Sequence, residues 1–212
     1  MLRVTVLCSD PHHPVNVMLR QWSSVVKDRA EVIIVRTVAE TAGGDLLFLV
    51  SCHEIVEADV RRRYRHALVL HASALPECRG MSPHVWQILE GRTELTMSLL
   101  TAEDKVDSGA IWRQVRFEVP RTAVFEEINS SLFSAEMDLM TWAIDHCDEV
   151  QPRPQSGNPT YCRRRTPADS EIDPSKSLAD SFDAIRVADP HRYPAYFTLQ
   201  GRKFRISIEP IT

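Results

Sequence analysis

The sequence lacks the cysteine pattern of a disulfide-stabilised or zinc-binding protein. Its five cysteines are an odd number, and no two of them form a CxxC pair. Zinc sites and small disulfide scaffolds are commonly built from such pairs. We therefore expect reduced thiols at all five positions, no metal site and no catalytic cysteine.

The sequence also lacks an excess of positive charge and a long apolar run near its start. With 25 Lys and Arg against 29 Asp and Glu, the formal net charge is -4, which excludes a broad cationic surface for nucleic acid. A small anionic substrate held by a few arginines remains compatible. The apolar residues 2–8 are interrupted by Ser9, Asp10 and Pro11 too soon for a signal peptide or a membrane span. We expect a cytoplasmic protein with no membrane or nucleic-acid partner.

What is present is enough apolar sequence for a sizeable core, since 43% of the residues are hydrophobic. Short, nearly all-apolar runs alternate with amphipathic segments, a pattern typical of an α/β protein with a doubly wound, mostly parallel sheet. The expected strands are 2–8, 31–35, 45–50, 67–70, 95–100 and 110–119. The expected helices are 15–26, 57–66, 83–89 and a long one for which Thr122 is the expected N-cap. We interpret Arg61, Arg62 and Arg63 as a solvated face.

A change of composition after residue 150 predicts a second part of the chain. Residues 151–174 are rich in Pro, Arg, Ser, Asp and Asn, which indicates an irregular connector. A helix at 175–186 and a hairpin of strands 193–197 and 204–208 should follow. We therefore divide the chain into a sheet domain, 1–150, and an extension, 151–212, packed on it.

The residues with the clearest chemical potential lie at the end of one expected strand. The run Leu68-Val69-Leu70 ends at His71, and carboxyl ends of parallel strands are where function gathers in such sheets. Asp107 lies in a loop that leads into another strand. A carboxylate beside an imidazole fixes its tautomer and stabilises its charged form, so the two side chains are candidates for proton transfer at a carbonyl.

Several motifs in fixed order resemble the formyltransferases that use 10-formyltetrahydrofolate. They are His71-Ala72-Ser73-Ala74-Leu75-Pro76, Arg79-Gly80, Pro83, Gly91 and Asp107-Ser108-Gly109-Ala110-Ile111. The separation of 107 − 71 = 36 residues is the spacing expected of sugar-modifying members. Segment 161–173 resembles the one that follows the catalytic domain in this family. The later residues 184–187 and 192–196 look like the sugar N-formyltransferase branch. Val-Leu-His with Pro-x-x-Arg-Gly-x-Ser-Pro looks like the pseudaminic acid pathway members of that branch.

The resemblance implies a Rossmann-like formyltransferase fold and a set of roles. His71 and Asp107 would be catalytic, with Asp107 acting directly or through water. The pterin of the co-substrate would bind Ser51, Cys52, His53, Glu54, Ile55, Val56, Glu103, Asp104 and Lys105. The nucleotide-linked amino sugar would meet Ser9, His13, Asn16, Ser73, Arg79, Gly80, Ser82, Trp86 and Tyr193. For Arg79, Trp86 and Tyr193, packing roles stay open.

One position departs from the family pattern. The family triad is Asn-x-His plus Asp, and the asparagine would fall at Val69, on the strand face that His71 shares. An isopropyl group there cannot donate to a tetrahedral oxyanion, and losing one such donor costs roughly a hundred- to a thousandfold in rate. Protonated His71, a backbone N–H or Asn16 are the candidates to replace it.

We therefore expect formyl transfer to the amine of a nucleotide-linked aminodeoxy sugar, with the 4-amino-4,6-dideoxy altrose-type precursor of pseudaminic acid as the candidate substrate. A glycinamide ribonucleotide-type transformylase and a non-catalytic folate or nucleotide-sugar binding protein are the alternatives. The sequence is also compatible with a homodimer.

Overall fold

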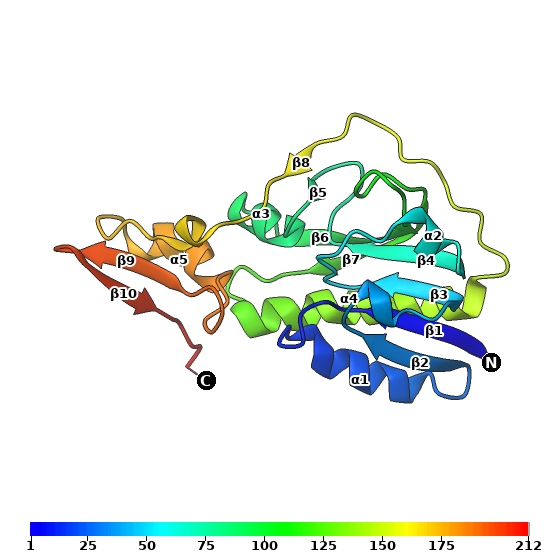
Figure 1. Cartoon of the computed structure of the whole chain (residues 1–212). Helices are drawn as coiled ribbons and strands as arrows, with labels where there is room; N and C mark the ends of the chain where they lie inside the picture. Colours follow the sequence, from blue (N-terminus) through cyan, green and yellow to red (C-terminus); the bar gives the residue numbers. More distant parts are fainter. Residues whose placement is uncertain (212) are drawn as a thin grey trace.

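A six-stranded sheet forms the centre of the computed structural model, which describes residues 1–211 (Figure 1). Across the sheet the strands run β2 (Ala30–Val35), β1 (Leu2–Leu7), β3 (Gly44–Leu49), β4 (Tyr64–His71), β6 (Glu94–Thr101) and β7 (Ile111–Glu118). The first four are parallel, and β6 and β7 join as antiparallel strands. The doubly wound, mostly parallel sheet predicted from the sequence is confirmed.

Two helices cover one face of this sheet and enclose the main core. In α1 (Val15–Val25), Val15, Leu19 and Trp22 recur at helical spacing and are buried. The long helix α4 (Phe125–His146) packs beside α1, and its apolar side joins the same cluster as Phe48, Leu68 and Leu70 of the sheet. Because alternate strand residues point to opposite faces, Val69 and His71 face the other side.

That other face carries short elements and loops. The 3-10 helix η1 (Val38–Glu40) and α2 (Ala58–Arg61) lie on connections between strands. After β4 come the two-residue strand β5 (Arg79–Gly80) and α3 (Pro83–Leu89), which begins at a proline as predicted. The active-site candidates of β4 thus end among loops rather than under a long helix.

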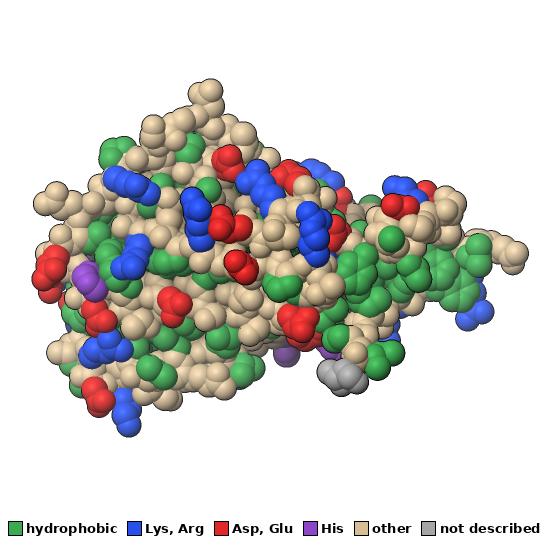
Figure 2. All heavy atoms as spheres, turned by 180° about the vertical axis from the view of Figure 1, so that it is seen from behind, with side chains coloured by type: hydrophobic (Ala, Val, Ile, Leu, Met, Phe, Trp, Pro, Cys, Tyr) green, Lys and Arg blue, Asp and Glu red, His purple; other side chains and the backbone are tan. Residues whose placement is uncertain are grey.

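The C-terminal part crosses this face and then projects from it. The connector after α4 passes over the sheet to β8 (Tyr161–Cys162), which pairs with β5 (Figure 1). The 3-10 helix η2 (Pro167–Ser170), α5 (Leu178–Arg186) and the hairpin of β9 (Ala195–Leu199) and β10 (Arg202–Ile206) form a small separate cluster. Figure 2 shows hydrophobic side chains gathered on this projection, and Leu178, Tyr193 and Leu199 are among its exposed apolar residues. The hairpin is confirmed, and the division at residue 150 stays a prediction.

Two local expectations were wrong. The helix expected over 57–66 is only α2, because β4 begins at Tyr64, which pairs with Gly44 and donates its hydroxyl to Thr5 at 3.0 Å. Thr122 does not cap α4. The N-cap is Val124, whose backbone N–H donates to Glu127 Oε2 at 2.9 Å.

No helix within residues 1–211 combines the length and apolar character needed to cross a membrane.

Candidate active site

The predicted pair His71 and Asp107 meets at the end of β4. His71 Nδ1 lies 3.4 Å from Asp107 Oδ2, and their side chains are only 6% and 7% exposed. The other ring nitrogen, Nε2, lies 2.8 Å from the carbonyl oxygen of Cys78. Each ring nitrogen thus faces an oxygen that can accept a hydrogen from it. The geometry therefore suits an imidazole that holds and releases a proton beside a carboxylate.

The backbone around Asp107 is shaped to deliver its carboxylate. Asp107 has a left-handed φ of 51°, and its Oδ2 also accepts the backbone N–H of Gly80 at 2.8 Å. Gly80 has φ of 108°, and a Cβ there would collide with the carbonyl of Cys162. Gly109 similarly leaves no room for a Cβ against the carbonyl of Thr101. These glycines permit the close approach of three chain segments.

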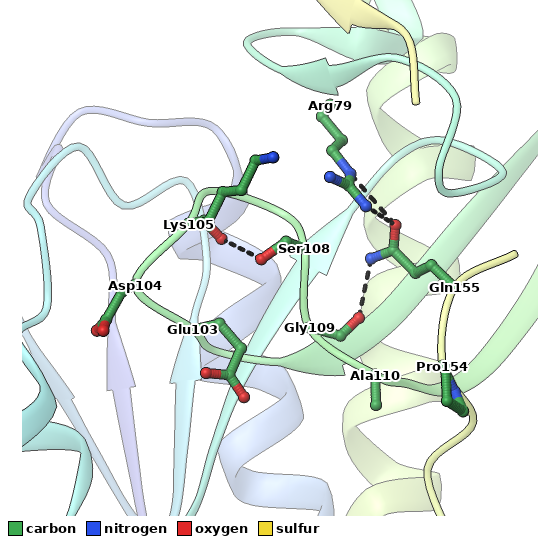
Figure 3. A pocket seen from close by; sticks show the side chains of 9 residues that line it. All are labelled: Arg79, Glu103, Asp104, Lys105, Ser108, Gly109, Ala110, Pro154 and Gln155. Carbon is green, nitrogen blue, oxygen red and sulfur yellow. Dashed lines mark hydrogen bonds between the residues drawn. The ribbon is translucent and has the colours of Figure 1, made fainter. Parts of the chain in front are cut away.

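Gln155 of the connector clamps the Asp107 loop. Its Nε2 donates to the carbonyls of Asp107 and Gly109, each at 2.8 Å. Its Oε1 accepts from Arg79 Nη2 at 2.6 Å, and Figure 3 shows this contact and the one to Gly109. A cavity of about 500 Å³ lies beside this clamp, between the loop 103–110, Arg79 and Pro154. Sequence reasoning missed Gln155, since an isolated glutamine in an irregular connector carries no pattern.

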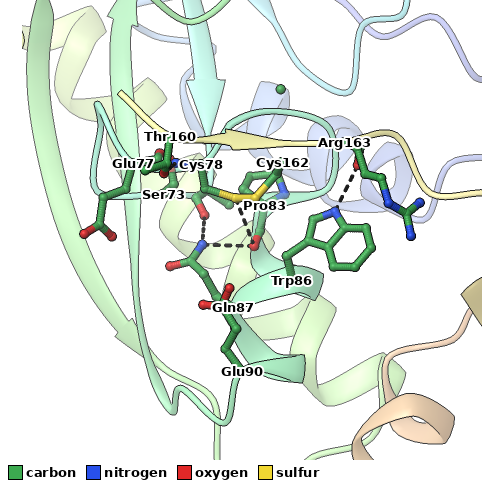
Figure 4. The surroundings of a disulfide bond; sticks show 12 residues. Ser73, Glu77, Cys78, Pro83, Trp86, Gln87, Glu90, Thr160, Cys162 and Arg163 are labelled. Atoms are coloured by element: carbon green, nitrogen blue, oxygen red, sulfur yellow. Dashed lines mark hydrogen bonds between the residues drawn. A yellow bond between two sulfur atoms is a disulfide. The ribbon is translucent and has the colours of Figure 1, made fainter. Parts of the chain in front are cut away.

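The expectation of reduced thiols throughout was wrong. Cys78 and Cys162 form a disulfide with a Cα–Cα distance of 4.8 Å, which fastens β8 to the segment before β5 (Figure 4). The backbone N–H of Cys78 donates to Thr160 Oγ1 at 2.8 Å beside it. The separation of 84 residues hid this pairing from spacing rules. The disulfide lies next to the carbonyl that binds His71.

Arg61 joins the two loops predicted to bind the co-substrate. Its Nη1 donates to the carbonyl of Val56 at 2.6 Å, and its Nη2 forms an ion pair with Asp104. The Arg61 side chain is 13% exposed, so the prediction of a solvated arginine run was wrong at this residue. Below the loops, Val69 packs against a cluster that includes Val56 and Ala102.

The loop after β1 joins the same edge. His13 Nε2 lies 3.2 Å from Ser51 Oγ, and the backbone N–H of His53 donates to Ser9 Oγ at 3.2 Å. Cys52 contacts Ser9 through sulfur, and Glu54 accepts the N–H of Val38 at 3.3 Å. The structure thus brings residues predicted to bind the co-substrate together with residues predicted to bind the sugar nucleotide. Ile55, which was also predicted to bind the co-substrate, is 79% exposed.

Other predicted residues are engaged within the chain. The amide of Asn16 donates to three carbonyls of its own loop, and its oxygen accepts from Arg36 at 2.6 Å. Ser73 donates to the carbonyl of Glu77 at 2.7 Å. Trp86 donates its indole N–H to the carbonyl of Arg163, whose guanidinium lies 4.7 Å from the ring centroid. Ser82 precedes α3 with a φ of 51°. The backbone carbonyl of Lys105 accepts the hydroxyl of Ser108 at 2.7 Å, and Glu103 lines the cavity. Tyr193 is 61% exposed, and the guanidinium of Arg192 lies over its ring.

Burial changes the protonation of three further groups. The pKa values of His13 and His84 fall to about 4, first because burial disfavours the charged ring and then because cations lie nearby. Burial raises the pKa of Glu136 to about 8, and its Oε2 has no hydrogen-bond partner within residues 1–211. Glu136 lies on the buried side of α4, one helical turn from both Leu132 and Met140. This helical spacing from apolar residues is the sequence signal that would have predicted a buried carboxyl group. Perturbed groups of this kind gather at functional sites.

Comparison with known proteins assigns the family. The model of the formyl transferase family matches residues 7–144, more than half of the chain, and the chain belongs to that family. A methionyl-tRNA formyltransferase of Francisella philomiragia is 26% identical over 140 residues, which cover 66% of this chain. The match spans only 44% of that relative's length.

Two solved structures share the fold over the whole chain. One is a methionyl-tRNA formyltransferase from Clostridium thermocellum, with a TM-score of 0.84, 18% identity and coverage of 100% of this chain and 94% of that one. The other is a 4-N formyltransferase from Francisella tularensis, with a TM-score of 0.79, 16% identity and coverage of 100% and 98%. Both identities are too low to carry more than the fold.

Proposed function

We propose that this protein transfers a formyl group from 10-formyltetrahydrofolate to the amine of a nucleotide-linked aminodeoxy sugar, as a sugar N-formyltransferase. The observation that carries the proposal is the buried His71–Asp107 contact of 3.4 Å at the carboxyl edge of β4. A sugar precursor of pseudaminic acid is the candidate substrate from the sequence resemblance. The likeness in fold to a 4-N formyltransferase supports the sugar branch.

In the proposed reaction a neutral amine of the sugar attacks the formyl carbon. The new tetrahedral centre carries a positive charge on the attacking nitrogen, which still holds both of its protons, and a negative charge on oxygen. His71, oriented by Asp107, takes one proton from the amine nitrogen and gives it to the folate nitrogen. The bond between the formyl carbon and the folate nitrogen then breaks as the oxyanion re-forms the carbonyl. Because Nε2 of His71 is held by the Cys78 carbonyl at 2.8 Å, that hydrogen bond must open for the ring to reach the substrate.

Once His71 has taken up the amine proton, its doubly protonated ring is our candidate for the missing oxyanion donor. Asn16 is a poor substitute because its amide hydrogens already serve three carbonyls of the loop after β1. An imidazolium beside Asp107 needs no asparagine to supply a hydrogen-bond donor. This role would account for an apolar residue at position 69.

The residues near the edge fit a flat heteroaromatic co-substrate. Arg61 holds the loops 51–56 and 103–105 together over an apolar cluster that includes Val56 and Ala102. Backbone groups of the loops would pair with the polar edge of the pterin, and the apolar cluster would contact its face. The folate would supply the formyl group that is transferred.

The decisive experiment is a formyl-transfer assay with a panel of nucleotide-linked aminodeoxy sugars. We expect turnover with at least one of them, and a loss of roughly a hundredfold or more in kcat for His71→Ala and for Asp107→Asn. The exposed positions His191→Ala and Asp28→Asn are matched controls that should keep activity. Near-wild-type transfer by either site variant would contradict the assignment.

The same assay separates the alternatives. Formylation of glycinamide ribonucleotide in place of every sugar would identify the purine-type reaction. Tight folate binding with no formyl product from any amine would favour a non-catalytic binding protein. This alternative is specific because valine at position 69 replaces the asparagine of the family pattern.

A further inference from the structure

The backbone of residues 78–80 holds both candidate catalytic side chains. The carbonyl oxygen of Cys78 lies 2.8 Å from His71 Nε2, and the backbone N–H of Gly80 donates to Asp107 Oδ2 at 2.8 Å. The two side chains face each other across 3.4 Å. A change in the conformation of this short segment therefore acts directly on the site.

The contact with Cys78 occupies the ring nitrogen that the proposed reaction needs. A carbonyl oxygen can only accept a hydrogen bond, so Nε2 of His71 carries its hydrogen in this arrangement. In that state Nε2 has no lone pair for the amine proton, and the carbonyl lies in front of it. We call this arrangement the closed state of His71.

Different bonds hold the two ends of the segment. The N–H groups of the residues on either side of Gly80 donate to carbonyls of the connector at 2.9 and 3.1 Å, which keeps Gly80 and its contact with Asp107 in place. Cys78 is held instead by its disulfide to Cys162 and by N–H donation to Thr160 Oγ1 at 2.8 Å (Figure 4). The disulfide therefore restrains the end that contacts His71.

The backbone of Cys78 has a conformation that a side chain disfavours. Its φ is 50°, in the left-handed region that residues with a Cβ occupy at a cost in free energy. The carbonyl of Cys78 reaches His71 from this conformation. Reduction of the disulfide removes a covalent restraint on Cys78, so the residue is freer to relax towards ordinary φ values and withdraw its carbonyl.

We propose that the disulfide between Cys78 and Cys162 is a redox switch, which keeps His71 in the closed state when it is formed and releases the ring when it is reduced. This inference rests on the proposed function, because it assigns control of the proton transfer by His71. Asp107 stays oriented in both forms, since its contact with Gly80 depends on backbone pairing and not on the cross-link. Reduction thus frees the ring without dismantling the site.

The effector is a low-molecular-weight thiol and its disulfide. Cys78 is buried, whereas Cys162 is half-buried beside Tyr161, which is 63% exposed. A thiolate that attacks the sulfur of Cys162 breaks the protein disulfide, forms a mixed disulfide there and releases the Cys78 thiolate. A second thiol then frees Cys162. One protein disulfide and two small thiols become two protein thiols and one small disulfide, and the reverse reaction closes the switch.

Formyl transfer by the full chain in glutathione buffers of graded reduction tests the switch, with protein thiols counted by alkylation and mass spectrometry. We expect the kcat of the wild type to rise roughly three- to tenfold on reduction, the factor for one neutral hydrogen bond opened before turnover. Cys162→Ser and Cys78→Ser should show the higher kcat in every buffer. Cys147→Ala, at a free cysteine after α4, should respond as the wild type does. Thermal unfolding checks that each variant is folded.

Hydrogen exchange followed by NMR gives a readout that needs no substrate. The Nε2 hydrogen of His71 should be protected in the oxidised protein, and reduction should speed its exchange roughly tenfold or more. The amide of Gly80 should stay protected in both forms. This contrast distinguishes release of the ring from a general loosening of the edge.

The outcomes separate the switch from the proposed reaction. If a sugar nucleotide is formylated and kcat is unchanged or lower after reduction, the reaction stands and the switch is wrong. If no amine is formylated but reduction releases Nε2 of His71 and leaves Gly80 protected, the switch stands and the proposed reaction is wrong. Unchanged protection of His71, or equal loss of protection at both groups, would also overturn the switch.

Discussion

Val69 lies in apolar surroundings at the point where the family pattern has an asparagine. It pairs with Leu49 on β3 and Leu100 on β6, and its side chain packs against a cluster that includes Leu75 and Ile111. An amide at this position would gain no evident partner within the cluster. The neighbours of Val69 therefore suit a hydrocarbon side chain.

We expect Val69→Asn to lower the free energy of unfolding by about 1–3 kcal/mol, because it places an amide in a half-buried, apolar position. We also expect kcat to change by only a few-fold, since His71 is our candidate donor to the oxyanion. Urea unfolding and the formyl-transfer assay measure the two effects. Val69→Ala controls for lost packing. A rate gain near a hundredfold would show that the natural site is impaired by the missing amide.

Gln155 holds the loop of Asp107 from outside the strand that carries His71. Gln155→Leu keeps much of the volume but removes the hydrogen bonds to Asp107, Gly109 and Arg79. We expect kcat to fall roughly tenfold or more, because a small displacement of the carboxylate misorients His71. Gln151→Leu, at an exposed connector position, is the control. A rise in KM with unchanged kcat would contradict a positioning role and indicate substrate contact instead.

At the scale of elements, the pairing of β5 with β8 fastens the connector to the active-site edge. Its disulfide closes a sequence separation of 84 residues, and cross-links of such length stabilise mainly by restricting the unfolded chain. We expect Cys162→Ser to lower the free energy of unfolding by about 2–5 kcal/mol under oxidising conditions. Denaturant titration with and without a reducing agent measures this.

The reductant should shift the unfolding midpoint of the wild type and leave that of Cys162→Ser unchanged. Cys52→Ser, at a free cysteine, should respond to the reductant as the wild type does. If reduction leaves the wild-type midpoint in place, the disulfide does not stabilise the fold.

The ends of elements were harder to predict than their presence. Residues 64–66 belong to β4 although their composition is that of an exposed helix, because pairing with β3 outweighs local propensity. Similarly α5 begins at Leu178, where Ser177 accepts the backbone N–H of Asp180 at 3.1 Å, rather than at the predicted residue 175. Tertiary contacts and caps decided these boundaries.

At the scale of the whole molecule, buried ionisable groups should make stability depend on pH in two opposite ways. His13 and His84 have pKa values near 4 in the folded protein, against an ordinary value of 6.5. The unfolded chain therefore binds more protons, and stability is lost as pH falls from 6.5 towards 4. Glu136 has a pKa near 8 against an ordinary 4.5, so the folded chain binds more protons and stability falls as pH rises towards 8.

Together these groups predict a stability maximum near pH 6.5. Above it we expect a loss of up to about 1.4 kcal/mol per pH unit from Glu136, and Glu136→Gln should remove most of that slope. Urea unfolding at pH 5, 6.5 and 8 measures the profile. Asp138→Asn, at an exposed position of the same helix, should keep it. An unchanged alkaline slope in Glu136→Gln would contradict the buried, protonated acid.

The sequence by itself determined the alternating elements, the parallel strands, the position of His71 at a strand end and the candidate partner Asp107. Those features follow from local periodicity and from motifs with fixed spacing. Only the tertiary structure decided that Gln155 holds the Asp107 loop and that Cys78 meets Cys162. The physical reason is that these contacts depend on the path of the connector, whose residues have no periodicity and acquire their positions by packing against the folded sheet.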